Sequence, residues 1–166
     1  PFFGVSIALA KDGIPEYGAV YDPLHDEFFY AAKGQGAALN GRKIQVSTET
    51  ELEDAVISIS WLRRRTEHLR FVTFVERISE RTSYFRRLGS AALISAYVAA
   101  GRVDAYMQGA INAWDIGAGT LLVCEAGGLV TDFDNNPIDL RLPYTDILAA
   151  NPEIHKLIMK EIIKGE

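Results

Sequence analysis

The carboxylate of Asp115 is the strongest candidate for chemistry, because it falls at the start of an expected helix. The surrounding segment, from Ala113 to Gly128, reads Ala-Trp-Asp-Ile-Gly-Ala-Gly-Thr-Leu-Leu-Val-Cys-Glu-Ala-Gly-Gly. A carboxylate at that place can cap the helix by accepting from backbone N–H groups of the first turn. It can also point outward and bind a hard cation such as Mg²⁺, which prefers oxygen ligands. Spacing alone leaves both uses open.

A second candidate is the junction between a short expected strand and the helix that follows it, where Gly89 precedes Ser90 and Ala91. The first backbone N–H groups of a helix have no partner inside the helix and can bind an anion or a hydroxyl. The alternative is that Ser90 is a plain N-cap.

Other catalytic templates are missing from the sequence, which has no Gly-x-Ser-x-Gly, no Walker-type loop and no His-Glu-x-x-His. The three histidines, His25, His68 and His155, lie far apart among polar neighbours, and we expect each of them at the surface. We expect Cys124, in the middle of a helix, to be a small buried hydrophobe rather than a nucleophile.

The elements that must position these residues change character near residue 50. Short strands separated by Gly, Pro and Asp turns come first and predict an antiparallel meander. Strand-like and helix-like segments then alternate, which indicates a sheet covered by helices. The expected strands are 3–10, 17–21, 27–32, 37–46, 55–60, 84–88, 103–107, 129–132 and 147–150, and the expected helices are 66–81, 90–100, 113–126 and 152–163, with Thr66 and Asn151 as N-caps.

Two glycines inside the helix of Asp115, Gly117 and Gly119, flank Ala118. Each Gly costs about 1 kcal/mol relative to Ala in a free-standing helix. Their presence therefore predicts close packing of this helix against another backbone.

Composition excludes several classes of protein. The 166 residues are 48% hydrophobic and 23% charged, which is globular rather than disordered composition. The formal net charge of −5 gives no argument for nucleic-acid binding, and no uncharged apolar run reaches the ~20 residues that a membrane span needs. With a single cysteine there can be no disulfide within the chain, which favours a cytoplasmic location.

Taken together, the motifs resemble the inositol monophosphatase family of Mg²⁺-dependent, lithium-sensitive sugar and polyol phosphatases. Residues 114–128 match the family signature Trp-Asp-x-(Ala/Gly)-Ala-Gly-x-x-(Leu/Ile)-(Leu/Val)-x-Glu-Ala-Gly-Gly almost residue for residue. Residues 89–92 and 98–106 match its Gly-(Ser/Thr)-Ala-Ala and Ala-x-Gly-x-x-Asp-Ala run. Residues 3–9, 18–23, 32–37 and 39–41 match further family segments, so the resemblance covers essentially the whole chain.

The resemblance implies an α+β fold, a layered αβαβα sandwich in which the N-terminal part of the first layer pair is missing. Residues 1–50 would be the remainder of an antiparallel-sheet subdomain, and residues 51–166 a C-terminal α/β subdomain. The implied function is Mg²⁺-dependent hydrolysis of a phosphate monoester, foremost inositol 1-phosphate, by a cytoplasmic homodimer with neither a membrane nor a nucleic-acid partner. The alternatives are a fructose-1,6-bisphosphatase, another sugar, histidinol or nucleotide phosphatase of the family, and a non-catalytic fragment or interaction module.

The resemblance also assigns site residues. Asp115 aligns with a metal ligand that lies near the substrate, and Gly89, Ser90 and Ala91 align with a segment whose backbone contacts substrate hydroxyls. Gln108 stands where inositol phosphatases usually have a glutamate that binds the inositol ring, which puts inositol 1-phosphate as the sole substrate in question. Among the arginines, we expect the run 63–65 on the solvated surface, and Arg86 or Arg87 near a phosphate.

The family's other metal-binding segments, Asp-Pro-x-Asp-Gly-Thr and Gly-Glu-Glu, do not occur in this sequence, which begins Pro-Phe-Phe-Gly with no Met. The expectation from the resemblance is that this chain carries only the C-terminal half of the site, and that the remaining metal ligands lie outside it.

Overall fold

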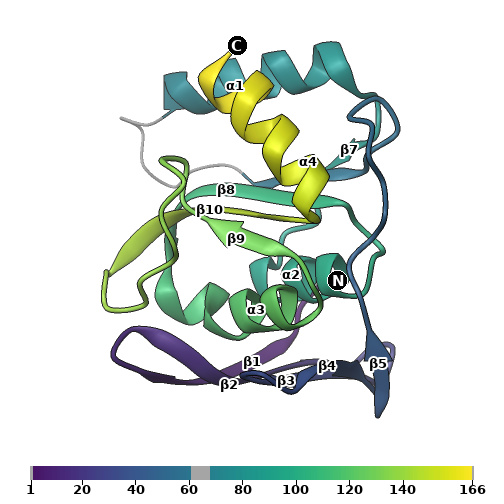
Figure 1. Ribbon diagram of the computed structural model, residues 1–166, viewed down its shortest axis with the longest axis vertical. Helices are drawn as coiled ribbons and strands as arrows, with labels where there is room; N and C mark the ends of the chain where they lie inside the picture. The colour runs from purple at the N-terminus through teal and green to yellow at the C-terminus, as the bar shows by residue number, and fades with distance from the viewer. Residues whose placement is uncertain (1, 61–67, 166) are drawn as a thin grey trace.

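The computed structural model describes residues 2–60 and 68–165, and it arranges them in alternating layers of sheet and helix (Figure 1). A first sheet lies at one end of the molecule. Helices α2 (Ala91–Ala99) and α3 (Ala113–Glu125) separate it from a second sheet, and α1 (His68–Arg81) and α4 (Pro152–Leu157) cover the far face of that second sheet. The α+β class expected from the sequence is therefore confirmed.

The first sheet is the expected antiparallel meander, with strand order β1-β2-β3-β4-β5. Two-residue hairpin turns join β1 to β2 at Asp12 and Gly13 and the last two strands at Asn40 and Gly41; the φ angles are positive at all four residues (53°, 83°, 48° and 79°), as this kind of turn requires. The strands are β1 (Val5–Lys11), β2 (Ile14–Asp22), β3 (Glu27–Ala32), β4 (Gly36–Leu39) and β5 (Arg42–Ile44).

The second sheet is mixed and has the order β7-β6-β8-β10-β9. Its first three strands are parallel, and the other two join antiparallel. The strands are β6 (Ile57–Ser60), β7 (Phe85–Arg86), β8 (Ala105–Asn112), β9 (Leu129–Thr131) and β10 (Tyr144–Ala150). Strand β8 continues five residues beyond the expected end at Met107, because β10 pairs with it as far as Asn112.

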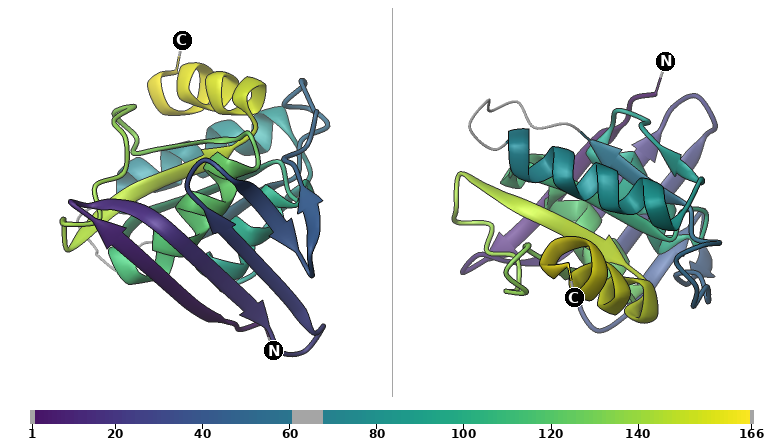
Figure 2. Two further views of the ribbon diagram at one scale, coloured as in Figure 1. Left: turned by 60° about the horizontal axis from the view of Figure 1, so that its bottom comes forward. Right: turned by 90° about the horizontal axis from the view of Figure 1, so that it is seen from above.

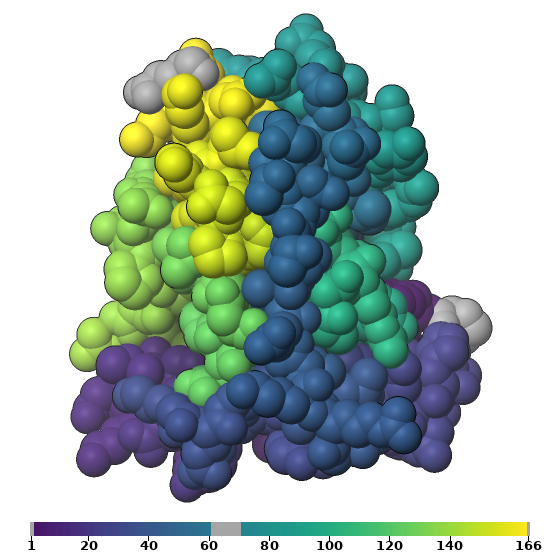
Figure 3. All heavy atoms as spheres, turned by 45° about the vertical axis from the view of Figure 1, so that its right-hand side comes forward, coloured from purple at the N-terminus to yellow at the C-terminus, as the bar shows by residue number. Residues whose placement is uncertain are grey.

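An extended segment, residues 45–56, connects the two sheets along the side of the molecule (Figure 3). The Val46 amide donates to the Ala126 carbonyl (3.1 Å), and the Asn151 side chain donates to the Ser47 hydroxyl (2.9 Å) and the Glu49 carbonyl (3.0 Å). One apolar core joins the first sheet to α2 and α3, so residues on both sides of position 50 share it. The division into subdomains at that position stays a prediction.

Helix α3 packs closely against β1 and β2 of the first sheet and against α2, as its small residues predict. A Cβ atom added to Gly117 would lie 3.2 Å from the Cβ of Ala8, and one added to Gly119 would lie 2.4 Å from the Cβ of Ser95. From the sheet side, a Cβ on Gly18 would lie 2.9 Å from the Cα of Ala118. Larger side chains at these positions would force the layers apart.

The C-terminal helix begins as expected, because Asn151 caps α4 by accepting from the Ile154 amide (2.9 Å). It continues as a π-helical segment, η2 (Ile158–Lys164), rather than as one regular helix. Its apolar residues pack on the outer face of the second sheet together with α1, seen from above in Figure 2. The expected cap Thr66 and the arginine run 63–65 lie outside the described residues.

Two expectations about single residues were wrong. His155 is buried, because α4 turns it toward β9, where its Nε2 lies 2.9 Å from the Thr131 hydroxyl. Cys124 is exposed rather than buried, since it lies in the last turn of α3.

His25 is exposed as expected, with its Nδ1 2.7 Å from a carboxylate oxygen of Asp22. The side chain of His68 is not among those described.

The outer face of the first sheet carries an exposed apolar surface. Ile7 is 68% exposed and Leu9 is 60% exposed, although both lie in the middle of a strand. The face also includes Val5, Tyr17, Phe28 and Tyr30. The outermost helical layer of the expected αβαβα sandwich is not among the described residues, which form βαβα layers. None of the described helices is long and apolar enough to cross a membrane.

We expect the 166-residue chain to bind a hydrophobic dye in its native state, because contiguous exposed apolar patches of this kind are uncommon on monomeric proteins. Replacing Ile7 and Leu9 by Thr should weaken dye fluorescence and self-association. It should change the free energy of unfolding by no more than about 0.5 kcal/mol per site, since both side chains are exposed. Leu142→Thr, at another exposed leucine, is the control. Equal dye binding in all three proteins would contradict the expectation.

Burial lowers the pKa of His155 below its ordinary value of 6.5. The folded state therefore disfavours the proton, and the stability that depends on neutral His155 is complete above pH 6.5. That stability falls as the pH drops from 6.5 through the lowered pKa of the folded state. In urea titrations from pH 7.5 to 5, the wild type should lose more stability than His155→Gln. Parallel losses in both proteins would show that His155 does not contribute.

Candidate active site

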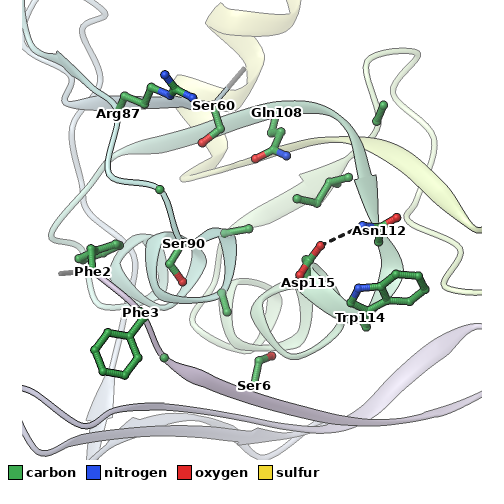
Figure 4. A pocket seen from close by; sticks show the side chains of 16 residues that line it. Phe2, Phe3, Ser6, Ser60, Arg87, Ser90, Gln108, Asn112, Trp114 and Asp115 are labelled. Carbon is green, nitrogen blue, oxygen red and sulfur yellow. Dashed lines mark hydrogen bonds between the residues drawn. The ribbon is translucent and has the colours of Figure 1, made fainter. Parts of the chain in front are cut away.

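A cavity of about 550 Å³ opens where five parts of the chain meet between the layers (Figure 4). These parts are the start of β1, the end of β6, the loop leading into α2, the second half of β8 and the start of α3. The lining residues are Phe2, Phe3, Gly4, Ser6, Ser60, Arg87, Gly89, Ser90, Ala91, Ala92, Gln108, Ala110, Ile111, Asn112, Trp114 and Asp115. All five site residues expected from the sequence, Gly89, Ser90, Ala91, Gln108 and Asp115, therefore line one cavity.

Asp115 does not cap its helix. The N-cap position of α3 belongs to Asn112, and Asp115 lies in the first turn. The Asn112 amide donates to the Asp115 carboxylate (Nδ2 to Oδ2, 3.2 Å), and the carboxylate projects into the cavity (Figure 4). The macrodipole of α3 favours a negative charge at this end of the helix. Of the two uses that spacing left open, capping is therefore wrong.

Gly89 and Ser90 form the wall of the cavity opposite Asp115. Gly89 has a φ of +105°, which residues with a Cβ rarely adopt, and a Cβ there would meet no atom within 4 Å. Ser90 is the N-cap of α2, and its hydroxyl accepts from the Leu93 amide (3.4 Å). Because α2 and α3 both begin at this cavity, the positive ends of two helix dipoles meet at it.

Gln108 extends into the cavity from β8, beside Ser60 in the parallel register of β6 and β8. Its side-chain oxygen accepts from the hydroxyl of Tyr106, with Oη and Oε1 2.6 Å apart. Tyr106 is fully buried. Burial raises the pKa of its hydroxyl far above the ordinary value, so the phenol stays protonated at physiological pH.

The β8 wall is shaped by a strained backbone at Ala110, whose φ is +48°. The Ala110 amide donates to the carboxylate of Asp146 (2.9 Å), which sits at an irregularity in β10 between Thr145 and Ile147. Positive φ at a residue other than glycine costs free energy of order 1–3 kcal/mol. The surrounding contacts, with Asp146 among them, stabilise this conformation.

Of the two arginines before Gly89, Arg87 lines the cavity, whereas Arg86 donates to the Phe85 carbonyl (2.9 Å) and does not. Sequence reasoning missed several residues of this site: Ser6, Ser60, Asn112, and Tyr106 and Asp146 behind the wall. Only Asn112 carried a signal, because asparagine directly before a helix is a common N-cap.

The described residues fit one side of a Mg²⁺ site. Asp115 is the only carboxylate among the described residues that line the cavity, and no three His, Cys, Asp or Glu side chains of the described chain gather as metal ligands. Mg²⁺ is commonly held by one or two carboxylates, with water and phosphate oxygens completing its shell. Asp115 suits one such ligand position, because it is an oxygen donor open to the cavity.

Comparison with known proteins identifies the family to which this sequence and fold are similar. The sequence profile of the inositol monophosphatase family matches residues 1–164. A relative named Nus factor SuhB, from Pasteurella multocida (strain Pm70), is 40% identical over 163 residues, which cover 98% of this chain and 60% of that protein. A relative named fructose-1,6-bisphosphatase/inositol-1-monophosphatase, from Thermotoga maritima, is 39% identical over 163 residues, again 98% of this chain and 60% of that protein.

The same likeness holds in three dimensions. The solved structure of an inositol monophosphatase from Anabaena (Nostoc) sp. PCC 7120 superposes with a TM-score of 0.88 at 39% sequence identity, covering 97% of this chain and 66% of that one. This chain spans about 60% of the length of the curated relatives that it matches. With the family profile matched along nearly its full length, the chain belongs to the inositol monophosphatase family.

Proposed function

We propose that the whole protein containing this chain is a Mg²⁺-dependent phosphatase that hydrolyses a phosphate monoester of a polyol or sugar, foremost inositol 1-phosphate. The observation that carries the proposal is the cavity at which two helix starts and the Asp115 carboxylate meet. Helix starts favour anions, and a carboxylate among them suits a cation that accompanies the anion. Because the chain belongs to the inositol monophosphatase family, the anion in this proposal is a phosphate monoester.

In this proposal Asp115 provides one metal ligand, and Asn112 orients its carboxylate. Bound Mg²⁺ would neutralise the phosphate charge and make a water molecule more acidic. The backbone N–H groups at the start of α2 would donate to substrate oxygens, for which the absence of a side chain at Gly89 leaves room. Arg87 would add positive charge at the same wall.

Other substrates of the family remain alternatives. The name of the Thermotoga maritima relative combines fructose-1,6-bisphosphatase with inositol-1-monophosphatase, and Gln108 replaces the glutamate usual in inositol phosphatases. Histidinol and nucleotide monoesters complete the alternatives. A panel of these esters, assayed with Mg²⁺, would rank them by kcat/KM.

A non-catalytic role is the second candidate. The relative from Pasteurella multocida is named a Nus factor, and the described part of this cavity holds a single carboxylate. We predict that the protein forms a homodimer and that it binds no nucleic acid. The net charge of −5 supports the second of these predictions.

Replacing Asp115 by Asn in the whole protein should lower turnover by about 100-fold, because the amide loses the charge that holds the cation. It should also abolish the upward shift of Tm that Mg²⁺ produces in the unchanged protein. Glu53→Gln, at an exposed carboxylate away from the cavity, is the matched control. Wild-type rates and a wild-type Tm shift in Asp115→Asn would remove Asp115 from the site.

The 166-residue chain alone should show little or no Mg²⁺-dependent phosphatase activity, since one carboxylate cannot hold the two or more cations of the proposed reaction. Release of inorganic phosphate from inositol 1-phosphate measures this, with the whole protein as the positive control. Robust turnover by the 166-residue chain would contradict the expectation.

A further inference from the structure

Strand β8 has one residue more than β10 in the stretch where the two strands pair beside the cavity. Gln108 lies opposite Ile147. Three positions later, Ile111 lies opposite Thr145, so two residues of β8 face the single residue Asp146 of β10. This pairing of two residues against one is a β-bulge, which bends the strand and increases its twist. The bulge lies in the part of β8 that lines the cavity.

The extra residue reverses the alternation of side chains between the two faces of the sheet. Tyr106 belongs to the apolar core that contains α2 and α3, the inner core, whereas Met107 belongs to the core that contains α1 and α4, the outer core. A regular strand would place residue 111, four positions after Met107, on the outer face as well. Ile111 instead lies in the inner core, and Ala110 packs against the outer core. The bulge therefore turns Ile111 inward.

This reversal affects where the carboxylate of the site lies. Ile111 is followed directly by Asn112, the N-cap of α3, whose side-chain amide donates to the Asp115 carboxylate (3.2 Å). Helix α3 packs between the two sheets, so it must begin on the inner face of the second sheet (Figure 1). A strand without the extra residue would direct Ile111 to the outer face and displace the first turn of α3, which carries Asp115.

The bulge requires a backbone conformation that alanine disfavours. The positive φ (+48°) belongs to Ala110 and not to the neighbouring Gly109, for which positive φ would have no steric cost. The Asp146 carboxylate accepts from the Ala110 amide (2.9 Å) in a partly buried position. A hydrogen bond to a charged acceptor is roughly twice as strong as a neutral one, so this contact offsets much of the strain at Ala110.

We propose that Asp146 is a positioning residue: by accepting from the Ala110 amide, it holds the bulge in β8 and thereby keeps the Asp115 carboxylate where it binds a cation. Asp146 is not among the described residues that line the cavity, so its effect passes through the backbone of β8 and not through contact with a ligand. This inference rests on the proposed function, because it takes Asp115 as a metal ligand.

The test combines two substitutions in the whole protein. Asp146→Ala removes the acceptor, and Ala110→Gly removes the steric cost of positive φ, so that the bulge no longer depends on the acceptor. Mg²⁺ binding is measured by titration calorimetry well below the Tm, and Asp115→Asn shows which part of the titration belongs to Asp115. Turnover of inositol 1-phosphate is measured over the same range of Mg²⁺ concentration. Asp54→Ala, at an exposed aspartate outside the cavity, is the matched control.

Asp146→Ala should raise the apparent Kd of the cation at Asp115 by about tenfold or more, because losing a charged hydrogen bond lowers the population of the competent arrangement by that factor. Saturating Mg²⁺ should restore kcat to within about twofold, since the cation selects the competent arrangement. Asp146→Asn, which keeps an acceptor oxygen, should raise the Kd by no more than about threefold. Adding Ala110→Gly to Asp146→Ala should return the Kd to within about threefold of its original value.

A purely structural role for Asp146 would lower the Tm without Mg²⁺ and leave the Kd of the folded protein as in Asp54→Ala. That result, or a raised Kd that Ala110→Gly does not restore, overturns the inference. If Asp146→Ala does not fold by itself, folding with a restored Kd when Ala110→Gly is added supports the inference, and continued failure to fold overturns it.

The same measurements separate this inference from the proposed function. If Mg²⁺ binds at Asp115 but no ester is hydrolysed, the proposed phosphatase function fails, and the Kd values still decide the role of Asp146. If the unchanged protein shows neither Mg²⁺-dependent turnover nor a titration step that Asp115→Asn removes, both proposals fail.

Discussion

The close fit of α3 between the two sheets is the constraint on which the rest of the structure depends. Its small residues allow the helix to approach β1 through Gly117, β2 through Ala118 and α2 through Gly119. Because protein interiors are close-packed, an added methyl group at these contacts would shift the helix as a body. The start of α3 carries Asn112, Trp114 and Asp115, so packing along the middle of the helix sets where the carboxylate of the site lies.

The same packing explains why the cavity lies where it does. Helices α2 and α3 pack side by side between the sheets, and both begin at the cavity. The first N–H groups of a helix have no partner within the helix, so a polar ligand in this cavity could offer them oxygen acceptors. The β8 wall is held from behind by Tyr106 and, through the strained Ala110 backbone, by Asp146. The groups that would touch a ligand are thus supported by buried groups that would not.

Local signals in the sequence were sufficient for much of this arrangement. Asn40-Gly41 predicted the hairpin turn, and Asn151 before a proline predicted the start of α4, because each acts through backbone conformation within a few residues. The signature around Asp115 and the Gly89-Ser90 junction also predicted the residues that the cavity brings together. The role of Asp115 was left open, because a residue can cap a helix only if the helix begins directly after it. The spacing of residues in the sequence does not locate the start of this helix to within three residues.

What the sequence could not show depends on residues distant in the chain. Ala110 takes a left-handed conformation because Asp146, 36 positions later, accepts from its amide, and nothing in the local sequence requires that. His155 is buried because α4 happens to face Thr131 on β9, although its neighbours in sequence are polar. The Gln108 side chain, whose oxygen accepts from the Tyr106 hydroxyl, lies beside Ser60 only because β6 pairs with β8. The surroundings of each group in this wall are therefore a property of the assembled sheet, and no local run of residues determines them.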